Sequence, residues 1–341
     1  MRGIRIKYVA VQLAVAVYIG LIAFAMFNSC SHCAVTSPKT LMKGPAEGKC
    51  QLDWDSLGVR EVHKSFVPTE ELIQSENPAV KKGGAWAPTN CQPWQRVAII
   101  IPYRDRVNSL LIFLRRIHRM LQAQKIHYRI ILAEQAGTGQ FNRGKLFNMG
   151  FLEAMKLDNF DCLVFHDVDL LPEDDRNLYL CDEHGRHLET ATDDLRYHLK
   201  YYNYAGGVVA ISVKNFKDIN GYANGYWGWG NEDDDFSARI TESGLLLTRP
   251  PELTGRYQMV PHPKNSRASS GNSMFFGWRT RWHSDGLNDP VGMNYSVVRV
   301  EEAALFTRVV ADIGSPPPSS SVTWDRSKDV SLWWFLSFYY P

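Results

Sequence analysis

The sequence predicts a mixed α/β fold whose sheet is built mainly from parallel strands. Two observations carry this prediction. Short, continuously apolar runs are typical of buried strands, and they alternate along the chain with longer segments that carry apolar residues at helical spacing. Such alternation favours parallel strands, because a parallel pair requires a crossover connection. In folds of this class, ligands bind beyond the carboxyl ends of the strands.

Five elements are predicted in order along the chain. The run 97–102 (VAIIIP) is apolar throughout and ends at a proline, so it predicts a buried strand followed by a loop. Segment 110–122 has helical spacing, and 128–133 (YRIILA) predicts a second buried strand. Segment 143–157 predicts another helix. The third strand, 162–165 (CLVF), leads directly into a pair of aspartates.

The composition is that of a globular protein without a nucleic-acid-binding surface. Of the 341 residues, 45% are hydrophobic and 22% charged, which excludes a disordered or collagen-like chain. Lys and Arg total 38 and Asp and Glu total 36, so the net charge is +2 and no polybasic surface is predicted. Aromatic residues make up 12%; most such residues pack in cores, but exposed rings stack on sugars.

The amino-terminal segment predicts a membrane anchor. Residues 8–27 carry no charge, and about twenty apolar residues span a bilayer. A cleaved signal peptide has a shorter apolar stretch, and a buried core helix would have nothing before it to cover it. Three basic residues precede the span, whereas none follows it until position 39. They are Arg2, Arg5 and Lys7. The positive-inside rule therefore predicts a cytoplasmic tail at 1–7 and a lumenal remainder, a type II topology.

The remaining organisation is one domain between two linkers. Residues 28–49 are small and polar and predict a stem, so the domain spans 50–316. The tail 317–341 begins within a linker-like SPPPSSS stretch and ends in an aromatic run that is too short to span a membrane. We expect that run to lie at an interface or to pack on the domain, and its role stays open.

A lumenal location makes disulfides expected. Cys30 and Cys33 lie just beyond the anchor, where they could cross-link chains or stay free. Four cysteines remain, and spacing alone leaves three possible connectivities open. These are Cys50, Cys91, Cys162 and Cys181. The tripeptide Asn294-Tyr-Ser is an N-glycosylation sequon, consistent with the secretory route.

Two acidic constellations point to chemistry. Asp167 and Asp169 follow an apolar strand, where two carboxylates can hold a divalent cation that bridges a diphosphate; the alternative is an ordinary turn or helix cap. The run 227–235 (WGWGNEDDD) places four acids after mobile, flat Trp-Gly pairs. Mutual repulsion predicts a raised pKa or a positive partner for at least one of them, which suits a general base. The alternative is a solvated helix start.

Two weaker signals accompany the acidic constellations. Met259 and His262 could complete a metal shell with Asp169, although such residues more often serve packing and the surface. Basic residues at strand and helix ends could bind phosphates, with Phe141 stacking on a base, although surface ion pairs are the alternative for each. These basic residues are Arg104, Arg106 and Arg143.

Together these motifs resemble the β-1,4-galactosyltransferase family, type II Golgi enzymes of GT-A fold. The similarity covers about residues 50–316. The motifs that carry it are IPYRDR (101–106), FNR (141–143), FHDVD (165–169), YWGWGNEDDD (226–235) and SDGLN (284–288). The resemblance implies Mn²⁺-dependent transfer of galactose from UDP-galactose, with inversion, to the 4-hydroxyl of an acceptor sugar, most simply the terminal N-acetylglucosamine of a glycan.

The resemblance also implies roles for individual residues. Asp233 is the expected general base with Glu232 beside it, and the disulfides are expected to be Cys50–Cys91 and Cys162–Cys181. The implied metal ligands are Asp169, Met259 and His262. The implied donor contacts are Pro102, Tyr103, Arg104, Asp105, Arg106, Phe141, Asn142, Arg143, Val168, Asp169, Trp229 and His262. The implied acceptor-side residues are Tyr201, Tyr204, Asn231, Glu232, Asp233, Asp234, Met274 and Phe275.

Three local features refine the expectation. Tyr204, before two glycines, matches a position where galactose-preferring members carry Tyr, and its bulk leaves no room for the acetamido group of N-acetylgalactosamine. Asn231 replaces the usual glycine and is expected to stiffen or re-aim the loop. The segment 260–280 is expected to close over the donor, and its stretch 273–278 lacks an arginine that the N-acetylglucosamine-specific members use.

Several alternatives stay open at this stage. A sister enzyme would keep the fold but use an N-acetylgalactosamine donor, or a glucosylceramide or xylose acceptor. A membrane-anchored sugar-binding protein would hold glycans without turnover, and a metal-independent hydrolase would keep its activity in EDTA. The expected partners are the donor, the acceptor glycan and the Golgi membrane, with no nucleic acid. The oligomeric state is undetermined.

Overall fold

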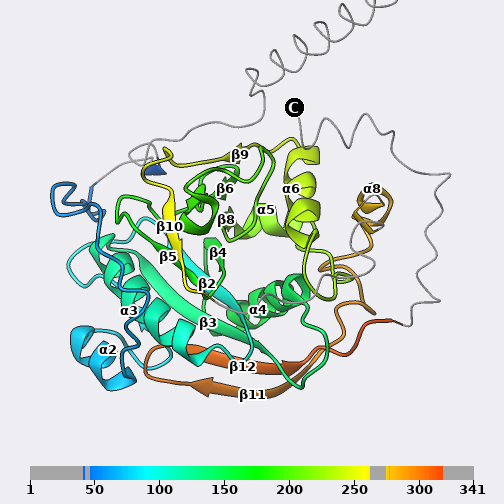
Figure 1. Ribbon diagram of the computed structural model, residues 1–341, viewed down its shortest axis with the longest axis horizontal. Coiled ribbons are helices and arrows are strands. Elements are labelled where there is room, and N and C mark those ends of the chain that lie inside the picture. The colour runs from blue at the N-terminus through cyan, green and yellow to red at the C-terminus, as the bar shows by residue number, and fades with distance from the viewer. Residues whose placement is uncertain (1–40, 43–46, 262–273, 276, 318–341) are drawn as a thin grey trace, which may run out of the picture.

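The computed structural model describes residues 41–42, 47–261, 274–275 and 277–317, and these form a mixed α/β domain (Figure 1). The predicted anchor, most of the stem, His262 and the aromatic tail from residue 318 lie outside the described residues. Within the described residues, no helix is long and apolar enough to cross a membrane.

The centre of the main sheet is as predicted. Strands β2 (Arg96–Tyr103), β3 (His127–Gln135) and β4 (Cys162–His166) are adjacent and parallel, in the order β3-β2-β4. The helices between them are α3 (Val107–Ala123) and α4 (Arg143–Leu157). All five elements predicted from apolar patterning are therefore confirmed, with ends that differ by at most three residues.

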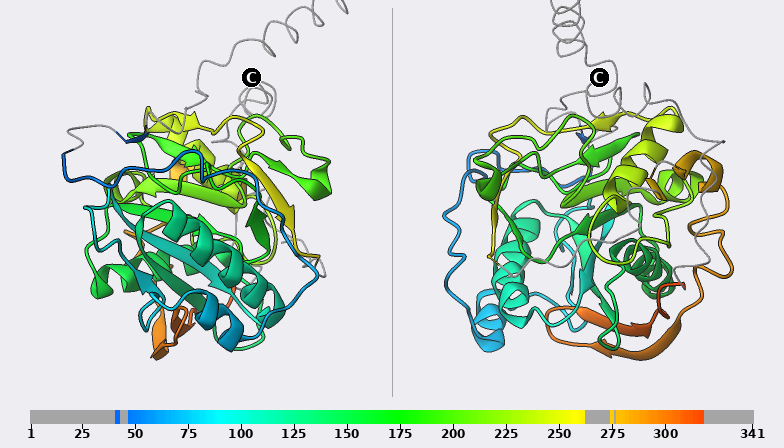
Figure 2. Two further views of the ribbon diagram at one scale, coloured as in Figure 1. Left: turned by 90° about the vertical axis from the view of Figure 1, so that its left-hand side faces the viewer. Right: turned by 45° about the vertical axis from the view of Figure 1, so that its right-hand side comes forward.

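The apolar run of β2 is continuous because both faces of the strand are covered. Val97, Ile99 and Ile101 pack into one apolar cluster with residues of α3, whereas Ala98 and Ile100 pack into another with residues of α4. Successive side chains of a strand point to opposite faces, so a strand buried on both sides has no polar position to alternate with. Figure 2 shows α3 and α4 on opposite faces of the sheet.

The complete sheet is mixed, which corrects the expectation of mainly parallel strands. Within the described residues it has nine strands, in the order β11-β12-β3-β2-β4-β8-β6-β9, with β1 pairing β3. Strand β8 runs antiparallel to both β4 and β6, and β11 runs antiparallel to β12. The chain between β4 and β8 contains short strands and a 3₁₀ turn but no crossover helix, so an antiparallel return is the available arrangement.

A smaller sheet lies beside the carboxyl end of β4. It contains β5 (Leu170–Pro172), β10 (Arg256–Met259) and β7 (Ala191–Thr192), with β10 in the middle. Met259 pairs with Leu170 in this sheet. The pairing therefore holds Met259 next to the segment that follows β4, although the two are far apart in sequence. Figure 1 shows β10 beside β5.

The remaining elements complete the domain. The strands are β1 (Ala85–Trp86), β6 (Gly185–His187), β8 (Val208–Ser212), β9 (Leu247–Thr248), β11 (Ser296–Glu302) and β12 (Thr307–Asp312). The helices are α2 (Glu70–Glu76), η2 (Asp193–Leu195), α5 (Val213–Asp218), α6 (Glu232–Glu242) and α8 (Trp278–Arg281).

Two disulfides tie loops to this framework. Cys50 bonds to Cys91, with Cα atoms 4.9 Å apart, and Cys162 bonds to Cys181, with Cα atoms 5.6 Å apart. The pairing implied by the resemblance is thus confirmed. The second bridge begins at the first residue of β4, the strand that leads into the paired aspartates.

Candidate active site

A cavity of about 620 Å³ opens beyond the carboxyl ends of β2 and β4. Its wall combines segments that are far apart in sequence: the end of β2, the loop before α4, the β4–β5 connection, the start of α6 and the end of β10. The predicted site residues that line it are Pro102, Arg104, Arg106, Phe141, Arg143, Val168, Asp169, Tyr204, Trp229, Glu232, Asp233 and Met259. The rule that ligands bind at the carboxyl edge of such a sheet therefore predicted its location.

The two aspartates after β4 have different partners. Asp167 accepts a hydrogen bond from Arg143 Nε at 2.7 Å, so its carboxylate is engaged within the protein. Asp169 lies with its Oδ2 atom 3.9 Å from Arg106 Nη1, and its backbone oxygen accepts from the Val260 amide at 2.8 Å. This second contact places Asp169 beside the end of β10, next to Met259.

The donor set at this end of the cavity fits a divalent cation shared with a diphosphate. Asp169 offers a carboxylate and Met259 a thioether, and cations bound with substrate phosphates take one or two carboxylates from the protein. No group of three or more His, Cys, Asp or Glu side chains that could hold a metal occurs among the described residues. The third expected ligand, His262, lies outside them.

Arg106 offers an uncommitted donor to an anion. Its Nη1 atom is buried and has no hydrogen-bond partner within the described part of the chain. Burying an unpaired donor is costly, so a phosphate oxygen at this position would remove the penalty. Arg104 lies nearer the mouth, where it donates to the Gly139 carbonyl at 2.7 Å and lies 5.4 Å from the centre of the Phe141 ring.

Arg143 links the metal-side aspartates to the acidic run. Its guanidinium contacts Asp167 and also lies 3.3 Å from Glu232 Oε1, and it packs 4.6 Å from the centre of the Phe147 ring. Burial disfavours its charge, but the two carboxylates outweigh that effect and raise the pKa of Arg143. Arg143 therefore supplies a permanent positive charge whose hydrogen bonds serve neighbouring acids as well as any ligand.

The four acids form the first turn of α6, in line with the preference of carboxylates for helix amino termini. Asn231 precedes them with φ of +75°, the left-handed region that glycine enters freely and asparagine tolerates better than most residues. The replacement of glycine at this position is therefore compatible with the turn that aims α6 at the cavity.

Burial perturbs the pKa values of two neighbouring acids of this turn. Burial and the adjacent Asp233 raise the pKa of Glu232 to about 7, against the attraction of Arg143. Burial and Asp233 likewise raise the pKa of Asp234 to about 7, although its carboxylate accepts a short hydrogen bond from Tyr201 Oη. Asp233 itself is half-buried and lines the cavity. Glu232 and Asp233 therefore face the cavity together, and the pKa values of Glu232 and Asp234 on either side of Asp233 are raised.

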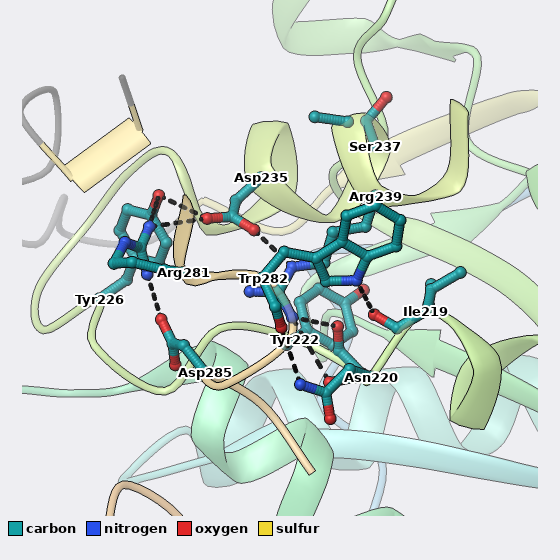
Figure 3. Close-up of polar contacts among 12 residues, drawn as sticks. Ile219, Asn220, Tyr222, Tyr226, Asp235, Ser237, Arg239, Arg281, Trp282 and Asp285 are labelled. Atoms are coloured by element: carbon teal, nitrogen blue, oxygen red, sulfur yellow. Dashed lines mark hydrogen bonds and ion pairs between the residues drawn. The ribbon is translucent and has the colours of Figure 1, made fainter. Parts of the chain in front are cut away.

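Asp235 is the anchor of the turn (Figure 3). Its carboxylate accepts hydrogen bonds from Arg239 Nε at 2.6 Å, from Arg281 Nη2 at 3.0 Å and from Tyr226 Oη at 2.8 Å. Burial alone would raise the pKa of Asp235, but the two arginines lower it. Arg281 also pairs with Asp285, so one network joins α6, α8 and the loop after α8. Both outcomes predicted from charge repulsion, raised pKa values and positive partners, therefore occur.

Several predicted contact residues lie behind the cavity wall rather than on it. Tyr103 is buried and its hydroxyl accepts from the Arg106 amide at 3.2 Å, Asn142 caps α4 by accepting from the Lys145 amide at 2.9 Å, and Phe275 packs with Trp278. Capping and packing use the polar or apolar surface that a ligand would need. The predicted residues that do not line the cavity are Tyr103, Asp105, Asn142, Tyr201, Asn231, Asp234, Met274 and Phe275.

The structure also adds cavity residues that sequence reasoning missed. Most come from the segment between β6 and β8, which the small sheet folds over the cavity. They are Glu189, Thr192, Asp194, Leu195, Lys200 and Gly207. No motif marks them; the only local signal is the glycine pair 206–207, which indicates a close backbone approach.

Comparisons with known proteins agree with this geometry. Residues 50–182 match the family described as the N-terminal region of glycosyl transferase group 7, and residues 186–263 match the N-terminal domain of galactosyltransferase. Human beta-1,4-galactosyltransferase 3 is 41% identical over 268 residues, 76% of this chain and 67% of that protein. Human beta-1,4-galactosyltransferase 2 is 41% identical over 251 residues, 72% of this chain and 67% of that protein. This chain thus spans about two thirds of the length of these relatives.

Solved structures agree as well. The catalytic domain of Drosophila beta-1,4-galactosyltransferase 7 in complex with xylobiose superposes with a TM-score of 0.56 at 28% identity, covering 64% of this chain and 94% of that one. A mutant of that enzyme in complex with manganese, UDP-Gal and xylobiose superposes with a TM-score of 0.55 at 27% identity, with the same coverage. This mixed α/β domain, with its GT-A-like fold, therefore belongs to the β-1,4-galactosyltransferase family.

Proposed function

We propose that this protein transfers galactose from UDP-galactose, with inversion and with Mn²⁺, to the 4-hydroxyl of an acceptor sugar. One observation carries the proposal: a single cavity is lined by an arginine that could bind a phosphate, an aspartate that could bind a metal and a second aspartate that could act as base. These residues are Arg106, Asp169 and Asp233. The complex of the Drosophila relative with manganese and UDP-Gal supports the same donor and metal.

The diphosphate of the donor binds at the β2 and β4 end of the cavity. Arg106 provides the unpaired Nη1 donor, and Arg104 lies beside Phe141, whose ring can stack on uracil. Asp169 and Met259, with His262, would hold Mn²⁺. When bound, the cation offsets the charge that develops on the departing UDP.

The acceptor hydroxyl is activated from the α6 side. Asp233 takes its proton, and inversion requires only this one base, by analogy with inverting glycosidases. Glu232, which lines the cavity and whose pKa is raised to about 7, carries a proton for part of the time and can donate a hydrogen bond to a sugar oxygen.

Tyr204 favours galactose as the transferred sugar. Its ring packs edge-on against His187, with centroids 5.2 Å apart, and against Tyr201 at 5.3 Å, so its position is fixed. Its hydroxyl lies against Gly206, as does Asp233 Oδ2. A phenol held there occupies the volume that a 2-acetamido group would need.

For the acceptor we favour terminal N-acetylglucosamine, the acceptor that the resemblance of the sequence motifs to the family implies. A xylose acceptor is the second candidate, and the xylobiose bound by the Drosophila relative is the observation that favours it. We place the protein in the Golgi membrane as a single-pass type II protein, by the anchor pattern at 8–27. Asn294 is exposed, so its sequon is accessible for glycosylation.

The experiment uses the full-length chain in detergent-solubilised membranes. UDP-galactose and UDP-N-acetylgalactosamine are each paired with N-acetylglucosamine, glucosylceramide and xyloside acceptors, with Mn²⁺ or with EDTA. We expect transfer of galactose in Mn²⁺ and none in EDTA. Transfer that survives EDTA would indicate a hydrolase-like, metal-independent site, and binding of UDP-galactose without product in any pairing would indicate a sugar-binding protein.

A further inference from the structure

The carboxyl group of Glu189 is a buried part of the cavity that the proposed reaction does not yet use. Glu189 follows β6, is only 3% exposed, and lines the cavity. Carboxylates are almost never fully buried unless they are paired. Its surroundings therefore need an explanation.

Within the described residues, no hydrogen-bond donor reaches this carboxyl. Nε2 of His187 lies 3.6 Å from Glu189 Oε2, which is beyond hydrogen-bonding distance. His187 accepts a hydrogen bond at Nδ1 from Arg249 Nε at 3.2 Å, so its proton is on Nε2. That Nε2 atom is itself buried without a hydrogen-bond partner in the described part of the chain.

Two consecutive glycines let the backbone pack closely against these groups. A Cβ on Gly207 would lie 2.4 Å from Glu189 Oε2, and a Cβ on Gly206 would lie 2.3 Å from Tyr204 Oη and 2.6 Å from Asp233 Oδ2. A bare stretch of backbone is thus bordered by a carboxyl on one side and by a phenol and a second carboxyl on the other. The three side chains Glu189, Tyr204 and Asp233 line the same cavity, so hydrogen-bonding groups border it on both sides of the glycine pair.

The charge around Glu189 argues against a phosphate at the same place. Asp167 and Asp194 lie close enough to raise its pKa further after burial, and Lys200 and Arg249 act in the opposite direction. An anion would face three acidic groups there. A neutral hydroxyl would instead complete the hydrogen bonding of the carboxyl whether that group is protonated or ionised.

We propose that Glu189 hydrogen-bonds a ring hydroxyl of the transferred hexose and thereby helps to determine which sugar the enzyme accepts. The inference rests on the proposed function and names a specificity residue for it. The donor hexose is a better partner for Glu189 than the acceptor sugar is. Glu189 lies beside Gly207 and Leu170, on the side of the cavity where the metal is expected, whereas Asp233 lies beside Gly206.

The test compares UDP-galactose with its 2-, 3-, 4- and 6-deoxy analogues, using the full-length protein in Mn²⁺ and the variants Glu189→Ala and Glu189→Gln. For the unmodified protein, we expect one deoxy donor to lose about 10- to 100-fold in kcat/KM. Glu189→Ala should lose a similar factor with UDP-galactose and no longer discriminate against that analogue. Glu189→Gln, which can still donate and accept, should keep most of the discrimination.

Two further measurements separate this role from a merely structural one. The affinity for UDP alone, measured by calorimetry in Mn²⁺, should be unchanged in Glu189→Ala. Glu153→Gln is the matched control, since Glu153 is a buried carboxylate that bonds Tyr295 at 2.6 Å and does not line the cavity; it should leave donor discrimination intact. Equal losses with every donor, or a weaker affinity for UDP, would overturn the proposal.

The proposed function can fail independently of the inference about Glu189. If the unmodified protein transfers no galactose to any acceptor, the affinities of UDP-galactose and its deoxy analogues, measured by displacement of bound UDP, still report on the hydrogen bond between Glu189 and the hexose. In that case, a sugar-dependent affinity that Glu189→Ala abolishes supports the inference, and an affinity independent of the sugar refutes it.

Discussion

Removal of Arg281 tests whether the network behind the acidic turn stabilises the domain. In Arg281→Ala, Asp235 loses the hydrogen bond at 3.0 Å from Nη2, Asp285 loses its ion pair, and the Met274 carbonyl loses a donor at 2.9 Å. Removing one partner of a buried ion pair lowers the free energy of unfolding by about 3 to 5 kcal/mol. Arg239 and Tyr226 remain hydrogen-bonded to Asp235, so we expect a loss at the lower end of this range, about 3 kcal/mol.

Arg279 is a matched control two residues away. It pairs with Glu242 at 2.6 Å, but both side chains are more than a third exposed, and such pairs contribute about 1 kcal/mol or less. Urea unfolding with the disulfides intact would give both free energies of unfolding, and Tm should fall by about 6 to 10 °C for Arg281→Ala. Equal losses for Arg281→Ala and Arg279→Ala would refute the assignment of Asp235 as a buried anchor.

Four further outcomes follow from the site. Asp233→Asn should abolish transfer while UDP-galactose binding persists, measured by calorimetry; parallel loss of both would contradict the role of base. Tyr204→Leu should admit UDP-N-acetylgalactosamine as donor in the transfer assay, and no gain with that donor would remove the specificity argument. EDTA should abolish transfer, and added Mn²⁺ should restore it; activity indifferent to both would exclude the metal-assisted mechanism. The raised pKa values of Glu232 and Asp234 mean that the unfolded chain binds fewer protons than the folded one between pH about 4.5 and 7, so these groups lower stability as pH rises through that window. Glu232→Gln with Asp234→Asn should flatten that decline in metal-free unfolding curves, and an unchanged slope would show that the two acids titrate normally.

Much of the fold was predictable because its core strands are locally distinctive. The run that became β2 is apolar at every position from 97 to 102, and such a run has few structural options other than a strand covered on both faces. The amphipathic spacing of α3 and α4 is equally local. The antiparallel course of β8 was not predictable, because its direction depends on the connection from β4 and not on the composition of the strand.

The residues of the candidate site were likewise predictable only in part. Asp169 and Asp233 were found from motifs, since acids directly after a buried strand or an aromatic turn are conspicuous in a sequence. The capping role of Asn142 was hidden, because a residue inside a binding motif and a residue at a helix start look the same in one dimension. Glu189 was missed for a related reason: no neighbour in sequence indicates that its carboxyl is buried.

The sequence by itself determined the strand and helix segments at the centre of the domain, the family motifs and the chemistry that their side chains can perform, because these depend on residue type and short-range spacing. Only the tertiary structure decided the partners of each charge. Arg143 bridges Asp167 and Glu232, and Arg281 pairs with Asp235, because segments separated by dozens of residues meet in the folded domain. The pair of Asp235 with Arg239 is instead local, since the two residues lie four positions apart on α6. Burial and those partners then set which acids are ionised, and neither can be known before the chain is folded.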